Sequence, residues 1–116
     1  MGRLTTHVLD TAQGRPASGV GVALFSLRPE RSLIAEASTN ADGRLDAPIL
    51  DSDAFAPGVY ELVFQAGDYF RATLSNLPDP LFVDEVVLRF GIAEADQHYH
   101  VPLLVSPWSY STYRGS

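Results

Sequence analysis

The chain has 116 residues, of which 46% are hydrophobic and 19% are charged, and its formal net charge is −6. This length predicts one domain over residues 1–116, and the acidic balance argues against binding to nucleic acid or to an anionic membrane. The absence of cysteine excludes disulfides, thiolate nucleophiles and cysteine-ligated metals. With no apolar leader and no apolar stretch near ~20 residues, the expected compartment is the cytoplasm.

Four short strands are predicted in the first half of the chain. Residues 4–9 and 20–27 alternate between faces, and turn-forming residues separate them. A third strand is expected over residues 33–39. The following stretch, NADG, predicts a tight turn because Asp-Gly tolerates a positive φ, and residues 44–46 follow as a short strand.

The second half continues with strands and contains the one predicted helix. Residues 58–65 alternate with period two, which places Tyr60, Leu62 and Phe64 on one face. The helix is expected over residues 68–76, capped by Asp68 and closed by the prolines that follow. The last predicted strands cover residues 82–90, 98–105 and 108–114. About eight short strands at regular spacing, with one short helix, indicate an all-β, two-sheet β-sandwich.

Polar side chains gather on one face of the terminal strands. Residues i and i+2 of a strand share a face, so His98, His100 and Pro102 point the same way. Ser111 and Tyr113 do so on the next strand, and His7 falls on the first. If these strands are neighbours, their shared face is too polar for a sandwich interior, and we expect it to face solvent or another subunit.

The residue types leave several interpretations of this face open. The histidines are consistent with a solvated surface, with a general-base site, or with a zinc site in which His7 joins His98 and His100. Arg44 is either a charged residue that protects a strand edge or a fixed cation for an electron-rich ligand. No nucleophile elbow, phosphate-binding loop or dinucleotide fingerprint is present.

Two long motifs at opposite ends of the chain resemble one known family. LTTHVLDTAQGRPA, residues 4–17, resembles the amino-terminal signature of the 5-hydroxyisourate hydrolases, also called transthyretin-related proteins. HYHVPLL, residues 98–104, and YSTYRGS, residues 110–116, resemble the carboxy-terminal signature. The resemblance covers the whole chain, and it implies the transthyretin-like sandwich and a homotetramer built as a dimer of dimers. It also implies active sites in a channel at the dimer–dimer interface.

The resemblance also implies which residues carry the activity. His7, Arg44, His100 and Ser116 match the family's catalytic residues. A wider set matches or adjoins positions that bind substrate or shape the channel, and these are Pro102, Tyr113, Arg114, Gly115 and, with an undefined role, His98.

The implied reaction is hydrolysis of 5-hydroxyisourate to 2-oxo-4-hydroxy-4-carboxy-5-ureidoimidazoline in urate degradation, without a metal or cofactor. A neutral imidazole can take a proton from water near neutral pH, so we expect His7 and His100 to share the acid–base role. Arg44 would hold the ring and the developing oxyanion, and Ser116 would bind the substrate or Arg44. The alternatives are a zinc-dependent cyclic amidohydrolase and a non-catalytic small-ligand carrier on the same fold.

Overall fold

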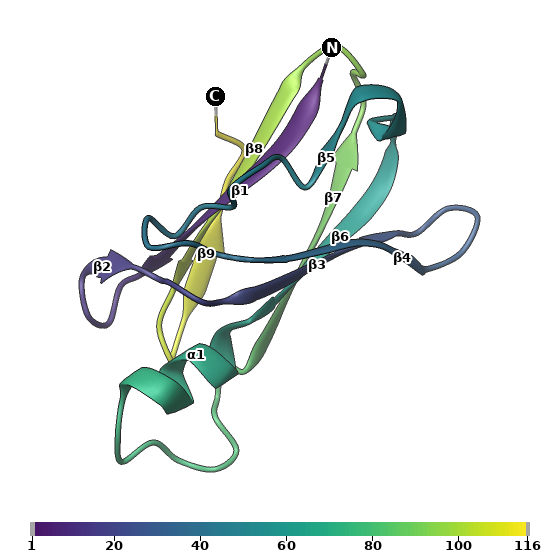
Figure 1. Cartoon of the computed structure of the whole chain (residues 1–116). Helices are drawn as coiled ribbons and strands as arrows, with labels where there is room; N and C mark the ends of the chain where they lie inside the picture. The colour runs from purple at the N-terminus through teal and green to yellow at the C-terminus, as the bar shows by residue number, and fades with distance from the viewer. Residues whose placement is uncertain (1, 116) are drawn as a thin grey trace.

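Two β-sheets packed face to face form this fold in the computed structural model, which describes residues 2–115 (Figure 1). The β1–β8 sheet contains β1 (Arg3–Asp10), β2 (Arg15–Pro16), β5 (Leu50–Asp51), β8 (His98–Val105) and β9 (Tyr110–Thr112). The β3–β6 sheet contains β3 (Gly21–Ser26), β4 (Ser32–Ser38), β6 (Gly58–Gln65) and β7 (Glu85–Ile92). A short 3-10 turn, Ser52–Ala54, follows β5, and one α-helix, α1 (Ala66–Thr73), follows β6. The prediction of an all-β, two-sheet sandwich with one short helix is confirmed.

The order of the strands brings the two ends of the chain together. The β1–β8 sheet runs β2-β1-β8-β9, with β5 also paired to β1, and the other sheet runs β4-β3-β6-β7. The strands β1 and β8 are parallel neighbours, although most of the chain separates them, whereas the other strand pairs are antiparallel. Figure 1 shows the purple amino-terminal strand lying beside the yellow-green β8.

The core lies between the sheets and follows the alternation in the sequence. On β6, Tyr60, Leu62 and Phe64 point inward and are buried, as predicted. On β1, Leu4 and Val8 are fully buried. The β8 strand contributes every second residue, Tyr99, Val101, Leu103 and Val105. The intervening residues of β1 and β8 therefore point away from the core, on the outer face of the sheet.

Several predicted boundaries are wrong, for reasons visible in the packing. The expected strand over residues 44–46 is only an isolated bridge between Arg44 and His7. The strand expected over 82–90 starts at Glu85, because Phe82 lies in a loop and is 76% exposed. The strand expected over 108–114 is shorter than predicted and includes only β9, because residues 106–109 form the turn that precedes it.

The helix begins two residues earlier than predicted. Gln65 occupies the N-cap position without a side-chain hydrogen bond, and Asp68 lies inside the first turn, where its carboxylate accepts from Arg71 at 3.1 Å. Burial of Ala66, Gly67, Tyr69 and Phe70 therefore positions α1 more strongly than capping does. No helix within residues 2–115 is both long and apolar enough to cross a bilayer.

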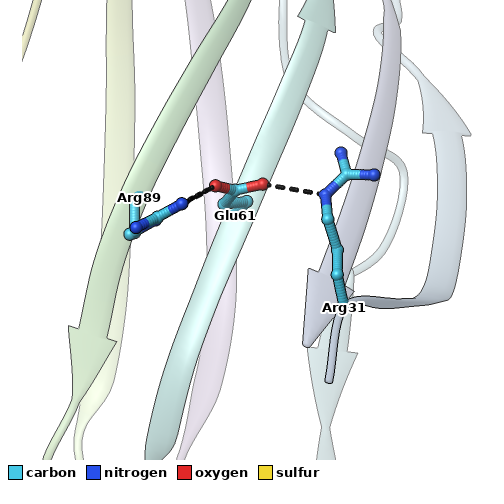
Figure 2. A network of polar contacts seen from close by, with 3 residues as sticks. All are labelled: Arg31, Glu61 and Arg89. Atoms are coloured by element: carbon cyan, nitrogen blue, oxygen red, sulfur yellow. Dashed lines mark hydrogen bonds and ion pairs between the residues drawn. The ribbon is translucent and has the colours of Figure 1, made fainter. Parts of the chain in front are cut away.

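One carboxylate is buried on the outer face of the β3–β6 sheet. Glu61 is 5% exposed, and both of its oxygens are paired (Figure 2). Arg31 Nε lies 3.1 Å from Oε1, and Arg89 Nη2 lies 3.0 Å from Oε2. Arg89 is the cross-strand neighbour of Glu61 on β7, whereas Arg31 reaches over from the β3–β4 loop with its guanidinium stacked 3.8 Å from the centre of the Phe25 ring. The hydrogen bond from Arg31, followed by the contacts with Arg89, lowers the pKa of Glu61 in spite of its burial.

We expect Glu61→Gln to lower the free energy of unfolding by roughly 1–2 kcal/mol at pH 7. The loss is limited because both arginines are half exposed, so water solvates their guanidinium groups once the carboxylate charge is gone. A carboxylate whose folded pKa lies below its ordinary 4.5 stabilises the fold above that value. The difference between wild type and variant should therefore disappear as the pH falls through the folded pKa of Glu61. Urea unfolding of both proteins at pH 7 and in acid measures this difference in the free energy of unfolding.

The exposed Glu36 on β4 supplies the matched control. Glu36→Gln should change the unfolding free energy by no more than about 0.5 kcal/mol. Equal losses in both variants, or a Glu61→Gln loss that persists in acid, would contradict the stabilising role of the ion pairs.

Candidate active site

The outer face of the β1–β8 sheet collects the predicted histidines. The parallel register sets Arg3 against His98 and Thr5 against His100. His7 lies two residues beyond Thr5 on the same face and is therefore a diagonal neighbour of His100. Across the sheet, β9 pairs Ser111 with Leu104, which places Ser111 on the same face. The prediction of one polar outer face is confirmed for the three histidines and Ser111, whereas Tyr113 follows the end of β9 and lies outside the strand.

A tight turn brings Arg44 to this face. Gly43 has a φ of +74°, which an L-residue rarely adopts, and its carbonyl accepts a 2.8 Å hydrogen bond from the amide of Val8. The next residue, Arg44, forms a bridge with His7 along the edge of β1. Asn40 closes the turn, because its Oδ1 accepts from the Arg44 amide at 3.2 Å. The NADG turn predicted from the sequence thus places a guanidinium beside the imidazole of His7.

A pocket of about 390 Å³ opens where these elements meet. Its walls include Thr5, Arg44, Leu45, Ala47, His98 and His100. Thr5, His98 and His100 come from the sheet, whereas Arg44, Leu45 and Ala47 come from the turn and the segment that follows it. This chain alone does not enclose the pocket.

Other predicted residues lie outside this pocket. Tyr113 is 62% exposed and, with Arg114, lines a different hollow of about 410 Å³ beside β7. Arg114 stacks 3.9 Å above the Tyr99 ring and donates to the carbonyl of His98 at 3.2 Å, contacts that lie at the start of β8. Pro102 is buried one step beyond His100 on β8. Ser116 lies outside the described residues.

Gly115 packs directly against the ring of His100. Its amide donates a 2.7 Å hydrogen bond to the His100 carbonyl. A Cβ built on Gly115 would lie 2.8 Å from Cδ2 of His100, closer than side chains tolerate. A larger side chain here would displace the imidazole, so glycine suits the close approach of the backbone to the ring.

Hydrogen bonds restrict the protonation of each imidazole. His7 Nε2 lies 2.9 Å from the carbonyl oxygen of Asp42. A carbonyl only accepts, so Nε2 carries the proton and Nδ1 is the basic nitrogen of neutral His7. Thr5 Oγ1 lies 2.8 Å from His98 Nε2 and 2.8 Å from His100 Nδ1. Sequence reasoning did not single out Thr5, although its place on the face of His7 was visible in the alternation.

All three histidines favour the neutral form. Burial, and then the positive charges of Arg44, His98 and His7, lower the pKa of His100. Burial and Arg44 lower the pKa of His7 more than Asp42 raises it. Burial, Arg3 and Arg114 lower the pKa of His98. Neutral imidazoles next to a guanidinium can accept a proton from water at physiological pH.

The zinc hypothesis fits this geometry poorly. Within residues 2–115, no group of three or more His, Cys, Asp or Glu side chains is arranged to hold a metal ion. The facing nitrogens of His98 and His100 are both turned to the Thr5 hydroxyl, and His7 Nε2 is turned to a carbonyl. These nitrogens bind protein groups: those of His98 and His100 meet at the Thr5 hydroxyl, and that of His7 binds the Asp42 carbonyl instead.

Known proteins of similar sequence and similar fold match this chain along nearly its whole length. The 5-hydroxyisourate hydrolase of Pseudomonas aeruginosa is 62% identical, and the match covers 100% of this chain and 93% of that protein. The structure of Klebsiella pneumoniae 5-hydroxyisourate hydrolase is 36% identical with a TM-score of 0.81, and the match covers 100% of both chains. An (S)-allantoin synthase structure is 48% identical with a TM-score of 0.94; the match covers 99% of this chain but 44% of that one. Residues 4–115 match the HIUase/transthyretin family, and the chain belongs to that family.

Proposed function

We propose that this protein hydrolyses 5-hydroxyisourate to 2-oxo-4-hydroxy-4-carboxy-5-ureidoimidazoline, a step in the degradation of urate, and that the pocket beside His100 is its active site. The observation that carries the proposal is the convergence of neutral imidazoles and a guanidinium on one pocket. The 62% identity to a protein named for this activity supports it. A ligand carrier has no need for basic nitrogens that are kept neutral by burial and by a nearby cation.

The chemistry is addition of water to a ring carbonyl. An imidazole takes a proton from water while the oxygen bonds to the carbonyl carbon, and the carbonyl oxygen gains negative charge. Arg44 stabilises this charge, because a fixed cation in a site shielded from water needs no reorganisation. The carbon–nitrogen bond of the ring then breaks, and the proton passes to the departing nitrogen. His100 and His7 share the two proton transfers, and Ser116 contributes to binding of the substrate.

The complete site is proposed to form in a homotetramer. The pocket lies on an outer sheet face and is open to one side, so a second dimer placed against this face would enclose the substrate. Pro102, Tyr113, Arg114 and Gly115 are proposed to shape the channel between the dimers. We propose the cytoplasm as the site of this reaction.

The direct test mixes the protein with freshly oxidised urate and follows the decay of 5-hydroxyisourate absorbance, with and without prior exhaustive chelation. We expect strong acceleration over buffer that chelation leaves unchanged. No acceleration would remove the enzyme proposal and favour the carrier. Loss of activity on chelation, restored by zinc, would favour the zinc-dependent amidohydrolase.

The pH dependence of kcat/KM should show one falling limb in acid. Because burial and Arg44 lower the pKa of His100 and His7 below the ordinary 6.5, both stay neutral to lower pH than a free histidine. kcat/KM should be constant from pH 7 to 8, and it should decrease only at a pH below the ordinary histidine pKa of 6.5.

Arg44→Gln removes one cause of the shift and should raise the titration midpoints of both rings, as measured by proton NMR of their Cε1–H signals. Midpoints that stay unchanged in this variant would contradict the electrostatic coupling.

A further inference from the structure

The Thr5 hydroxyl is shared by two histidines of the pocket. It projects from β1 on the outer face, opposite His100 in the parallel register, and its Oγ1 lies 2.8 Å from a nitrogen of each ring. The rings of His98 and His100 are 6.2 Å apart between centroids, too far for a direct hydrogen bond. We propose that Thr5 is a positioning residue that sets the tautomers of His98 and His100 and connects them as a proton relay. The inference rests on the proposed hydrolytic function of the same pocket.

A relay through Thr5 allows two proton arrangements. When its hydroxyl accepts from one ring and donates to the other, one facing nitrogen is protonated and the other is bare. In the first form His98 Nε2–H donates to Thr5, and Thr5 donates to His100 Nδ1. In the second form His100 Nδ1–H donates to Thr5, and Thr5 donates to His98 Nε2.

The second form is the one that makes His100 a base toward the pocket. With Nδ1 protonated, the lone pair of His100 lies on Nε2, which has no hydrogen-bond partner among residues 2–115. Gly115 packs on the neighbouring Cδ2 edge and holds the ring in place. His98 then carries its own proton on Nδ1. In this form the hydroxyl stabilises the tautomer that proton abstraction from water requires.

The same contacts allow the positive charge to move away from Arg44. When His100 Nε2 takes a proton from water, the Nδ1–H bond breaks and a bond forms to Thr5 Oγ1, while the Thr5 proton bonds to His98 Nε2. Charge then resides on His98, and His100 is neutral with Nε2 protonated. The reverse shift accompanies donation of the Nε2 proton to the departing nitrogen, so protons balance over the cycle.

The charged groups around the relay come from several elements. His100 faces Arg44 from the turn and His7 from β1, whereas His98 faces Arg3 from β1 and Arg114 beyond β9. All of these groups are cationic or become so on protonation. Neither ring therefore stabilises the proton taken from water, which favours rapid transfer of that proton to the substrate.

The test compares Thr5→Val, which keeps the branched shape without the hydroxyl, with Thr5→Ser, which keeps the hydroxyl. We expect Thr5→Val to lower kcat by about 10- to 100-fold with little change in KM, since partners that orient a functional histidine commonly have effects of this size. Thr5→Ser should stay within about threefold of wild type. Circular dichroism and thermal melting confirm that each variant folds.

Nitrogen NMR of histidine-labelled protein supplies a readout that a purely structural role would not change. In the wild type at pH 7.5, both His98 and His100 should be protonated at Nδ1 and bare at Nε2. In Thr5→Val, the His100 signals should move toward a tautomer mixture.

Retention of wild-type kcat in Thr5→Val, an equal loss in Thr5→Ser, or a wild-type His100 protonated at Nε2 would overturn the inference. A wild-type protein that does not accelerate hydrolysis overturns the proposed function instead, and the tautomer spectrum still decides the role of Thr5 separately.

Discussion

His100→Asn should lower kcat/KM for 5-hydroxyisourate by about 10²–10⁴-fold, the usual contribution of a general base. Asparagine keeps a polar group of similar reach, but its amide cannot take a proton from water. The backbone pairing of β1, β8 and Gly115 does not depend on the imidazole, so the fold should be kept. Steady-state kinetics at pH 7.5 measure the loss.

His7→Asn should also slow the reaction severely, because His7 is the second basic imidazole beside Arg44. Ser111→Ala is the matched control, since Ser111 is exposed on the same sheet face but does not line the pocket. Its kcat/KM should remain within about twofold of wild type. A wild-type rate in His100→Asn would show that this imidazole is not the base.

Asp10→Ala should lower the free energy of unfolding by about 3–5 kcal/mol, a large share of the stability of a domain of this size. Asp10 is 1% exposed at the end of β1. Its Oδ1 accepts from the amides of Ala12 and Gln13 at 2.9 Å each, and its Oδ2 accepts from Gln13 Nε2 and Tyr69 Oη at 2.8 Å each. Removal of the carboxylate leaves buried donors without an acceptor and disconnects α1 from β1.

Tyr69→Phe is the matched control for this network, because it removes one of the four hydrogen bonds. It should cost about 1 kcal/mol. Urea unfolding of both variants, followed by circular dichroism at one protein concentration, makes the comparison. Equal losses would mean that the phenol, and not the carboxylate, holds the helix against the sheet.

Local alternation in the sequence was sufficient to predict several elements of this fold. The strands over residues 58–65 and 98–105 have the predicted bounds, because in each of them every second side chain points into the core. The helix boundary was wrong because the pattern around Asp68 suggested a cap, whereas burial of Phe70 and its neighbours determines where the helix lies. Packing between distant segments overrides a local signal of this kind.

The site was predicted less completely than the fold. Alternation indicates on which face of the sheet a side chain lies, but not which side chains of the adjacent strands lie beside it. His7, His98 and His100 were placed on one face, but only the parallel register shows that Thr5 lies between two of the rings. Arg44 was predicted on a strand and instead follows a turn held by Asn40 and Gly43. The position of a guanidinium relative to an imidazole depends on contacts that link residues far apart in the chain.

The parallel pairing of β1 with β8 also has a consequence during synthesis. The hydrogen-bonded side chains of Thr5 and His100 are 95 positions apart. At a translation rate of ~5–20 residues per second, roughly 5–20 s pass between the synthesis of β1 and the synthesis of β8. Its uncovered edge is then able to pair with other chains. Nascent protein of this kind should depend on chaperones until β8 is made, because the pocket cannot form before then.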